Sequence, residues 1–121
     1  MEVTPKHIGD KGEVIAAEFL ERKGYKVAHK NWRVKQYEVD IICETKTEIV
    51  FVEVKTRKTA ALGAPESFVD KTKQRNLIQA ANYYMQSVNA DKEFRFDIVT
   101  VISNNQGQKV EHIENAFMPR W

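Results

Sequence analysis

Two segments of the chain have apolar residues three and four positions apart, which is the spacing of an amphipathic helix. The first runs from about Ile8 to Lys23 and ends before Gly24, a residue typical of helix C-termini. Its apolar stripe consists of Ala16, Ala17, Phe19 and Leu20. The second runs from about Glu66 or Phe68 to Asn89, and Ser67 followed by Asp70 resembles a capping box. Its stripe consists of Leu77, Ala81, Tyr84 and Val88, with Ile78 and Met85 beside them.

Three strands are predicted between these helices. Tyr25 to His29 is expected to be a short strand, and the polar segment 31–36 after it is expected to be irregular. Tyr37 to Glu44 and Glu48 to Arg57 alternate clearly between two faces, which is typical of strands. The three residues that separate them leave room only for a hairpin.

The remaining segments complete one fold. Thr59 to Pro65 contains Ala, Gly and Pro and is expected to be a loop. Phe94 to Ile102 is a β-branched run typical of a core strand, and Lys109 to Phe117 is expected to be a last strand. The order α-β-β-β-α-β(-β) predicts a single domain, residues 1–121, of the mixed α/β or α+β class, with helices packed on a central mixed sheet.

Composition and charge exclude several classes of protein. The 121 residues are 42% hydrophobic and 30% charged, which suits one globular domain. Lys and Arg number 19 and Asp and Glu 17, so the net charge of +2 excludes a nucleic-acid-coating tail but leaves room for a local basic groove. The apolar runs are too short to span a bilayer, and the start of the sequence lacks a signal peptide. Cys43 is the only cysteine, so we expect no disulfide framework and no cysteine-based zinc site. Together these features predict a cytoplasmic protein without a membrane partner.

Several acidic residues interrupt the hydrophobic pattern. Glu13 shares the apolar stripe of the first helix, where a carboxylate is costly unless it is paired or binds a cation. A hairpin that pairs Thr45 with Glu48, or Glu44 with Ile49, sets three further pairs opposite each other. These pairs are Ile42 with Phe51, Asp40 with Glu53, and Glu38 with Lys55. A slip of one residue would mix the valine face of the second strand with the charged face.

Glu13, Asp40, Glu53 and Lys55 are therefore expected to converge on one face. Two opposed carboxylates repel each other unless a positive charge lies between them. Hard divalent cations such as Mg²⁺ prefer oxygen ligands and are held by one or two carboxylates together with waters and substrate phosphate. Lys55 could orient an attacking water or stabilise charge that develops on a phosphate. This set predicts metal-assisted phosphodiester hydrolysis with Mg²⁺ or Mn²⁺.

The same residues carry a family resemblance. Asp40 followed by Glu53-Val54-Lys55 on the next strand resembles the D…(D/E)xK signature of the restriction-endonuclease-like nucleases. Gly9, Glu13 and Gly24 are spaced as in archaeal Holliday junction resolvases, and over residues 9–117 the chain is similar to the bacterial YraN-like family. The motifs similar to that family are Gly12-Glu13 with Ala16-Ala17, Asn31-Trp32-Arg33, Glu38-Val39-Asp40-Ile41-Ile42, Val50-Phe51-Val52-Glu53-Val54-Lys55-Thr56-Arg57, Gly63 with Pro65, and Arg95-Phe96-Asp97. Tyr37 departs from the family, which usually has Gly there.

The resemblance implies a restriction-endonuclease-like core that cuts DNA, including branched DNA, with the second helix near the DNA-facing cleft. It implies Glu13, Asp40, Glu53 and Lys55 as the site. The three acids would hold the metal. Arg33, Arg57, Lys71 and Lys73 are expected to contact phosphates. Because a resolvase cuts two strands symmetrically, that function predicts a homodimer.

Plainer interpretations remain open at this point. A Glu-x-Lys pair is common on a solvated strand face, Asp40 could be an edge-strand charge, and Glu13 an exposed helical charge. Glu38 could form a salt bridge to Lys55 or contribute to the metal site. His7 and His29 are expected at the surface, although His7 could reach the cleft, and His112 is expected to have a structural role. The segment Asn31-Trp32-Arg33 could stack on a base or clamp a phosphate, but a Trp in a small domain is more often part of the core. A non-catalytic nucleic-acid-binding or adaptor module, or a nuclease acting on RNA, would show the same sequence features.

Overall fold

The computed structural model describes residues 5–59, 69–89 and 91–118, with side chains from residue 11 onward. Its elements, in chain order, are α1 (Pro5–Arg22), β1 (Lys26–Val34), β2 (Tyr37–Glu44), β3 (Glu48–Arg57), α2 (Lys71–Val88), β4 (Glu93–Asn104) and β5 (Gly107–Phe117). The predicted α+β order is confirmed. Neither described helix is long and apolar enough to cross a membrane.

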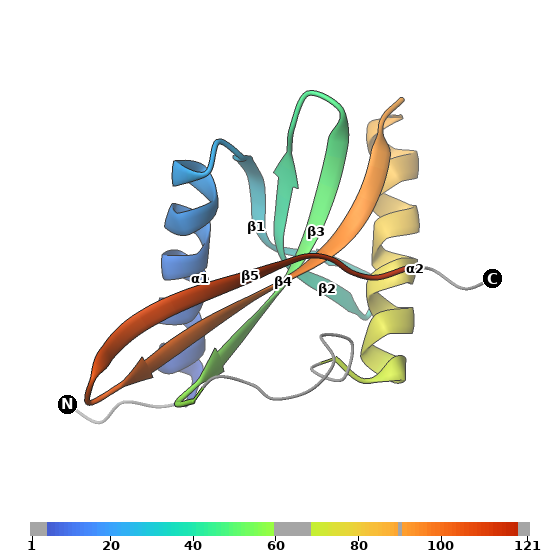
Figure 1. Cartoon of the computed structure of the whole chain (residues 1–121). Coiled ribbons are helices and arrows are strands. Elements are labelled where there is room, and N and C mark those ends of the chain that lie inside the picture. The colour runs from blue at the N-terminus through green and yellow to red at the C-terminus, as the bar shows by residue number, and fades with distance from the viewer. Residues whose placement is uncertain (1–4, 60–68, 90, 119–121) are drawn as a thin grey trace.

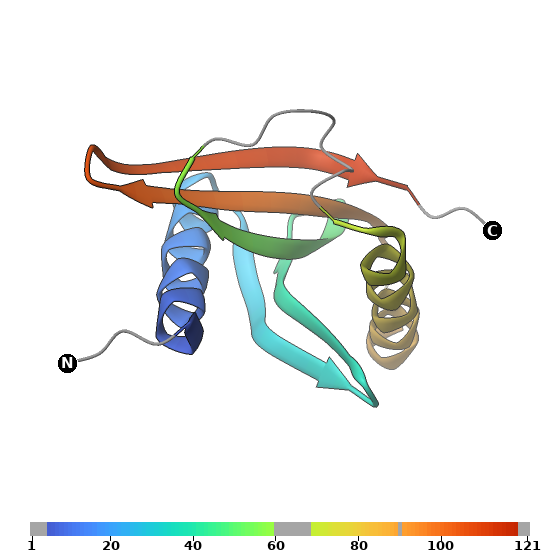
Figure 2. The same ribbon diagram turned by 90° about the horizontal axis from the view of Figure 1, so that it is seen from below.

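One five-stranded sheet in the order β1-β2-β3-β4-β5 forms the centre of the fold. All neighbours are antiparallel except β3 and β4, which are parallel and are joined through α2. The two helices flank the sheet, and both begin at the lower end of the view in Figure 1, where β3 ends. The β1–β2 hairpin projects away from β3, β4 and β5 between the two helices (Figure 2).

Each helix packs on a different face of the sheet. The valine face, with Val50 and Val52, packs against Ala16, Ala17 and Leu20 of α1. The opposite face contains Ile49, Phe51 and Phe96. It packs against Leu77, Ala80, Ala81 and Tyr84 of α2. Val88, which was predicted to belong to the stripe of the second helix, is 42% exposed.

The ends of the helices follow local chemistry. After α1, Gly24 adopts φ +98°, a conformation that costs glycine little, and the Tyr25 amide donates to the Leu20 carbonyl at 3.0 Å. Asp70 caps α2 because its carboxylate accepts a hydrogen bond from the Lys73 amide at 2.8 Å. The helix therefore begins later than predicted, at Lys71. The predicted cap Ser67 and the predicted loop after Thr59 lie outside the described residues.

The expectation that residues 31–36 are irregular is wrong for residues 31–34, because β1 continues to Val34, whereas residues 35 and 36 form the turn to β2. The hydrophobic pattern hid this strand for two reasons. β1 lies at the edge of the sheet, so many of its side chains are exposed. Its alternation is also broken by a shift of register between Val27 and His29 and by Asn31 at φ +51°.

Candidate functional site

The β2–β3 hairpin has the register that its sequence predicts. Thr45 and Glu48 close a two-residue loop, with the Thr45 amide donating to the Glu48 carbonyl at 2.9 Å. The Glu48 amide in turn donates to the Thr45 hydroxyl at 3.0 Å. Ile42 lies opposite Phe51 as expected, and the pairing continues to Ile41 opposite Val52.

The ladder between the two strands ends at the next position, which is Asp40. Here the Val54 amide of β3 donates to Asp40 Oδ2 at 2.8 Å instead of to a backbone carbonyl. The carboxylate of Asp40 therefore occupies the place where β2 and β3 separate, beside Glu53 in the register of the hairpin.

Glu53 is a buried carboxylate between two lysines. It is only 5% exposed, and the buried positions before it on β3 are all apolar, so a charged side chain is unusual here. The Lys55 ammonium lies 3.7 Å from Oε1 and the Lys73 ammonium 3.7 Å from Oε2. Both distances are too long for hydrogen bonds. Oε2 is buried and accepts no hydrogen bond from the described residues.

The charges of this site oppose each other. Burial, and next the charge of Asp40, raise the pKa of Glu53 to about 7, although Lys73 and Lys55 act in the other direction. Burial also raises the pKa of Asp40, against the hydrogen bond from Val54. The charges of Lys73 and Lys55 therefore do not offset the effects of burial and of Asp40 on the pKa of Glu53.

Glu13 belongs to α1, and its place beside Asp40 and Glu53 stays a prediction. The apolar pattern showed which side of α1 is buried but not which face of the sheet it covers. α1 packs on the valine face, whereas Glu53 faces Lys73 of α2. Half-buried Glu13 follows Gly12, whose Cα lies against the Thr56 side chain near the end of β3. Among the described side chains, no three of His, Cys, Asp and Glu form a group that could hold a metal.

The other predicted contact residues belong to β1, β3 and α2. Glu38 forms an ion pair of 3.7 Å with Arg33 across β1 and β2, so the hypothetical salt bridge to Lys55 is wrong. Arg57 is exposed at the end of β3, and Lys71 is exposed at the start of α2. Of these predicted contact residues, Lys73 reaches the carboxylates, through its ion pair with Glu53.

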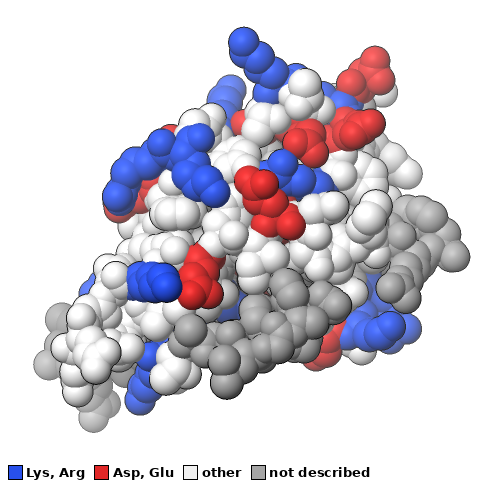
Figure 3. Space-filling view, in the orientation of Figure 1, with Lys and Arg blue, Asp and Glu red and all other residues white. Residues whose placement is uncertain are grey.

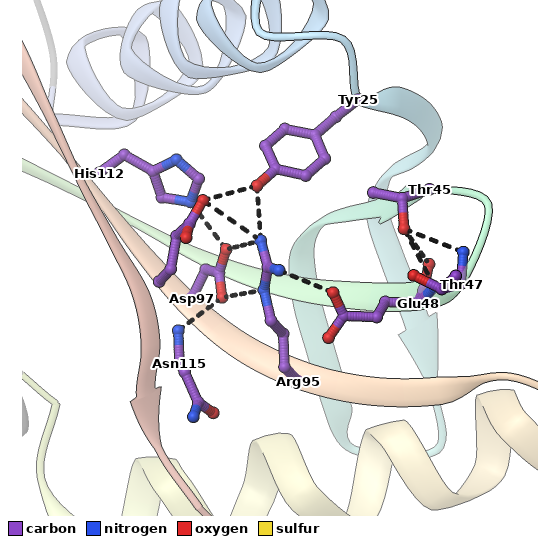
Figure 4. A network of polar contacts seen from close by, with 9 residues as sticks. Tyr25, Thr45, Thr47, Glu48, Arg95, Asp97, His112 and Asn115 are labelled. Atoms are coloured by element: carbon purple, nitrogen blue, oxygen red, sulfur yellow. Dashed lines mark hydrogen bonds and ion pairs between the residues drawn. The ribbon is translucent and has the colours of Figure 1, made fainter.

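A second polar network, which sequence reasoning missed, lies on the α1 side of the sheet (Figure 4). Asp97 is fully buried and accepts hydrogen bonds from Arg95 Nε at 3.0 Å, His112 Nε2 at 2.7 Å and the Asn115 amide at 3.0 Å. Burial raises the pKa of Asp97, but the bonds from His112, Arg95 and Asn115 outweigh it, so that pKa lies below its usual range. The signal in the sequence was an acid within a β-branched core strand.

The outer contacts of this network tie distant segments together. The Arg95 guanidinium also contacts Glu48 at 2.9 Å and the Tyr25 hydroxyl, which donates to Glu114. Lys23 donates to His112 Nδ1 at 2.7 Å, so the Nε2 proton of His112 points to Asp97. Because each central group has partners, the network is structural, as predicted for His112. Trp32 also has the predicted structural role, since it packs against the α2-side core.

The Asp40–Glu53 pair has the donors that a hard divalent cation requires. Both residues offer carboxylate oxygens, the ligands that Mg²⁺ and Mn²⁺ prefer. The buried Oε2 of Glu53 has no hydrogen-bond donor among the described residues, and a bound cation would remove that deficit. The residues present therefore fit a divalent cation held by two carboxylates, with further positions left to water or substrate oxygens.

Comparison with known proteins agrees with the motifs. Residues 12–101 match the family described as "Uncharacterised protein family UPF0102". A UPF0102 protein from Parabacteroides distasonis is 44% identical over 110 residues, which cover 91% of each chain. A relative from Caldanaerobacter subterraneus subsp. tengcongensis is 44% identical over 119 residues, covering 95% of this chain and 98% of its own. A third, from Christiangramia forsetii, is 41% identical over 91% of this chain and 92% of its own. The chain therefore belongs to the UPF0102 family, the YraN-like family that its motifs resemble.

Proposed function

We propose that this protein is a divalent-metal-dependent endonuclease that hydrolyses phosphodiester bonds of DNA, with branched or otherwise structured DNA among its substrates. The observation that carries the proposal is the buried carboxylate of Glu53, which lies beside Asp40 and is flanked by Lys55 and Lys73. Its Oε2 accepts no hydrogen bond from the part of the chain that the structure describes. A buried carboxylate is usually hydrogen-bonded by its neighbours, whereas the ammonium groups of Lys55 and Lys73 lie 3.7 Å from Glu53, too far to hydrogen-bond it.

The residues of the site have separate roles in this proposal. Asp40 and Glu53 hold Mg²⁺ or Mn²⁺, which supplies Lewis-acid stabilisation of the charge on the phosphate. Lys55, on the same strand and only 23% exposed, orients the attacking water and stabilises developing negative charge. Lys73 contacts a phosphate oxygen, and Arg57 and Lys71 contact neighbouring phosphates. Glu13 stays a predicted third acid, to be tested by its own variant.

A cleavage assay with a panel of substrates tests the proposal. Purified protein is incubated with supercoiled, linear, single-stranded and four-way-junction DNA, and with RNA, in Mg²⁺, Mn²⁺ or EDTA. We expect cleavage of at least one DNA in metal and none in EDTA. Asp40→Asn and Lys55→Ala should each slow cleavage by 100-fold or more, because single groups that stabilise a transition state contribute about that much.

The outcomes separate the alternatives. Loss of activity in Glu13→Gln would place Glu13 in the site, and unchanged activity would remove it. Cleavage that persists in both Asp40→Asn and Lys55→Ala would show that the site is elsewhere. The non-catalytic module would be favoured if DNA is bound but not cut under any metal condition, and if binding is unchanged in Glu53→Ala. In such a module, Lys55 and Lys73 would compensate part of the carboxylate charge without metal. A homodimer in solution is the further expectation if four-way junctions are cut symmetrically.

A further inference from the structure

One segment outside the proposed site holds much of the positive charge of the chain. Residues 22–37 contain six basic side chains and no Asp or Glu. They are Arg22, Lys23, Lys26, Lys30, Arg33 and Lys35. The other 105 residues hold 13 basic and 17 acidic side chains, a balance of −4 against the +2 of the whole chain. The charge of this protein is therefore strongly uneven.

The segment forms an exposed edge. β1 is a terminal strand of the sheet, and Lys26, Lys30, Arg33 and Lys35 are all exposed along it or at its hairpin tip. We call these four residues the β1 basic edge. Among the described residues, Lys26 and Lys30 take part in no ion pair, and Arg33 has only the solvated contact of 3.7 Å with Glu38. These charges are available to an anion from outside.

Aromatic contacts restrain the Lys35 charge at the tip of the β1–β2 hairpin. The Lys35 ammonium lies 4.9 Å from the centre of the Tyr83 ring of α2, and Tyr83 stacks with Tyr37 of β2 at 6.3 Å. A cation over an aromatic face is restrained without being neutralised. The charge on the β4–β5 side of the molecule is mixed, unlike that of the β1 basic edge. Acidic and basic side chains are interspersed over the face that Figure 3 shows.

The β1 basic edge adjoins the candidate metal site. Lys30 pairs with Ile41 and Trp32 with Val39, so Asn31 of β1 lies across from Asp40 of β2. Neighbouring strands are about 4.8 Å apart. A nucleic acid with one phosphate at Asp40 and Glu53 would therefore extend over the edge. From Lys26 to Arg33 the strand covers at most about 23 Å, which equals about seven base pairs.

We propose that the β1 basic edge binds the phosphate backbone of the DNA duplex arm beside the bond that is cut. The inference rests on the proposed function for the position of that bond. It adds a substrate class, since the preferred DNA must have a duplex arm of about seven base pairs or more on the β1 side. The other explanation for lysines on an edge strand is protection against edge-to-edge aggregation, which requires no DNA.

Salt-dependent binding distinguishes these explanations. Binding of a 30-base-pair duplex is measured in EDTA by fluorescence anisotropy at several NaCl concentrations. The test variant combines Lys30→Gln and Lys35→Gln. The control combines Lys46→Gln and Lys109→Gln, which remove the same charge at the β2–β3 turn and on the opposite edge strand. Since each lost phosphate contact lowers the slope of log K against log salt by about 0.9, we expect the test variant to lose about 2 from the slope. The control should keep the wild-type slope.

Three results would overturn the proposal. They are a wild-type protein that does not bind the duplex at low salt, a test variant with the wild-type slope, and an equal loss in both variants, which would reflect net charge alone. The assay contains no metal and needs no cleavage. A protein that cuts no DNA but binds it through the β1 basic edge would therefore contradict the proposed nuclease function and still support DNA binding by this edge.

Discussion

At the scale of single residues, Glu53 and Asp97 show two fates of a buried carboxylate. Asp97 accepts hydrogen bonds from three residues and has a lowered pKa, so its charge stabilises the fold. Glu53 is nearly as buried but has a raised pKa and an oxygen without a hydrogen bond from the described residues. Its charge costs stability in the absence of metal, as the proposed metal site requires.

Glu53→Gln should therefore stabilise the metal-free protein in a pH-dependent way. The raised pKa means that the folded protein keeps a proton between about pH 4.5 and 7 that the unfolded chain has lost. Stability from this residue falls as pH rises through that window and stays lost above it. We expect the thermal midpoint of Glu53→Gln to exceed that of the wild type by about 5 °C at pH 8 and to equal it at pH 4.5. Exposed Glu18→Gln is the control, and a lower midpoint at pH 8 for Glu53→Gln would contradict the interpretation.

Asp97→Asn should have the opposite effect. The substitution removes the negative charge that contacts the Arg95 guanidinium and His112. Removing one partner of a buried ion pair lowers the free energy of unfolding by about 3 kcal/mol. Urea denaturation at pH 7 measures this loss. Because the pKa of Asp97 is lowered, its contribution is present above about pH 4 and is lost as pH falls through the folded-state pKa, so the two proteins should converge in acid. Glu114→Gln, at the exposed rim, should cost less than about 1 kcal/mol, and an equal cost would argue against a buried network.

At the scale of elements, the sequence predicted what local patterns determine. The bounds of β2 and β3 and their register followed from strict alternation and a short turn. The later start of α2 was missed because Asp70 itself acts as the N-cap. The face covered by α1 was missed for a different reason. Periodicity identifies the buried side of a helix, whereas the sheet face that it covers depends on packing between distant elements.

Close packing of α1 on β3 can be tested at Gly12. A Cβ at this position would lie 2.5 Å from Thr56 Oγ1, a contact that stiff, β-branched Thr56 cannot easily relieve. Although alanine is the better helix former, we expect Gly12→Ala to lower the unfolding free energy by about 1–3 kcal/mol. Thr56→Ala should restore most of the loss in the double variant, which a double-mutant cycle would measure. A Gly12→Ala protein more stable than the wild type would show that the helix does not approach the strand this closely.

At the scale of the whole molecule, the distribution of charge is more informative than its sum. The net charge of +2 combines a basic edge along β1 with half-buried Asp40 and buried Glu53 at the end of the β2–β3 ladder. The sequence predicted the Asp40–Glu53 pair and Lys55 because hairpin register determines which residues are opposed. It could not predict Lys73 as the contact of Glu53, since that contact depends on how α2 packs.

The central claim, that Asp40 and Glu53 form a divalent-metal site, is tested most directly by calorimetric titration with Mn²⁺ at pH 7.5. Wild-type protein and Asp40→Asn are titrated under the same conditions, with circular dichroism to verify that both are folded. We expect saturable binding to the wild type and a loss of at least tenfold in affinity for Asp40→Asn, because one of two charged ligands is removed. Binding that is equal in both proteins, or absent from the wild type up to millimolar Mn²⁺, would contradict the account.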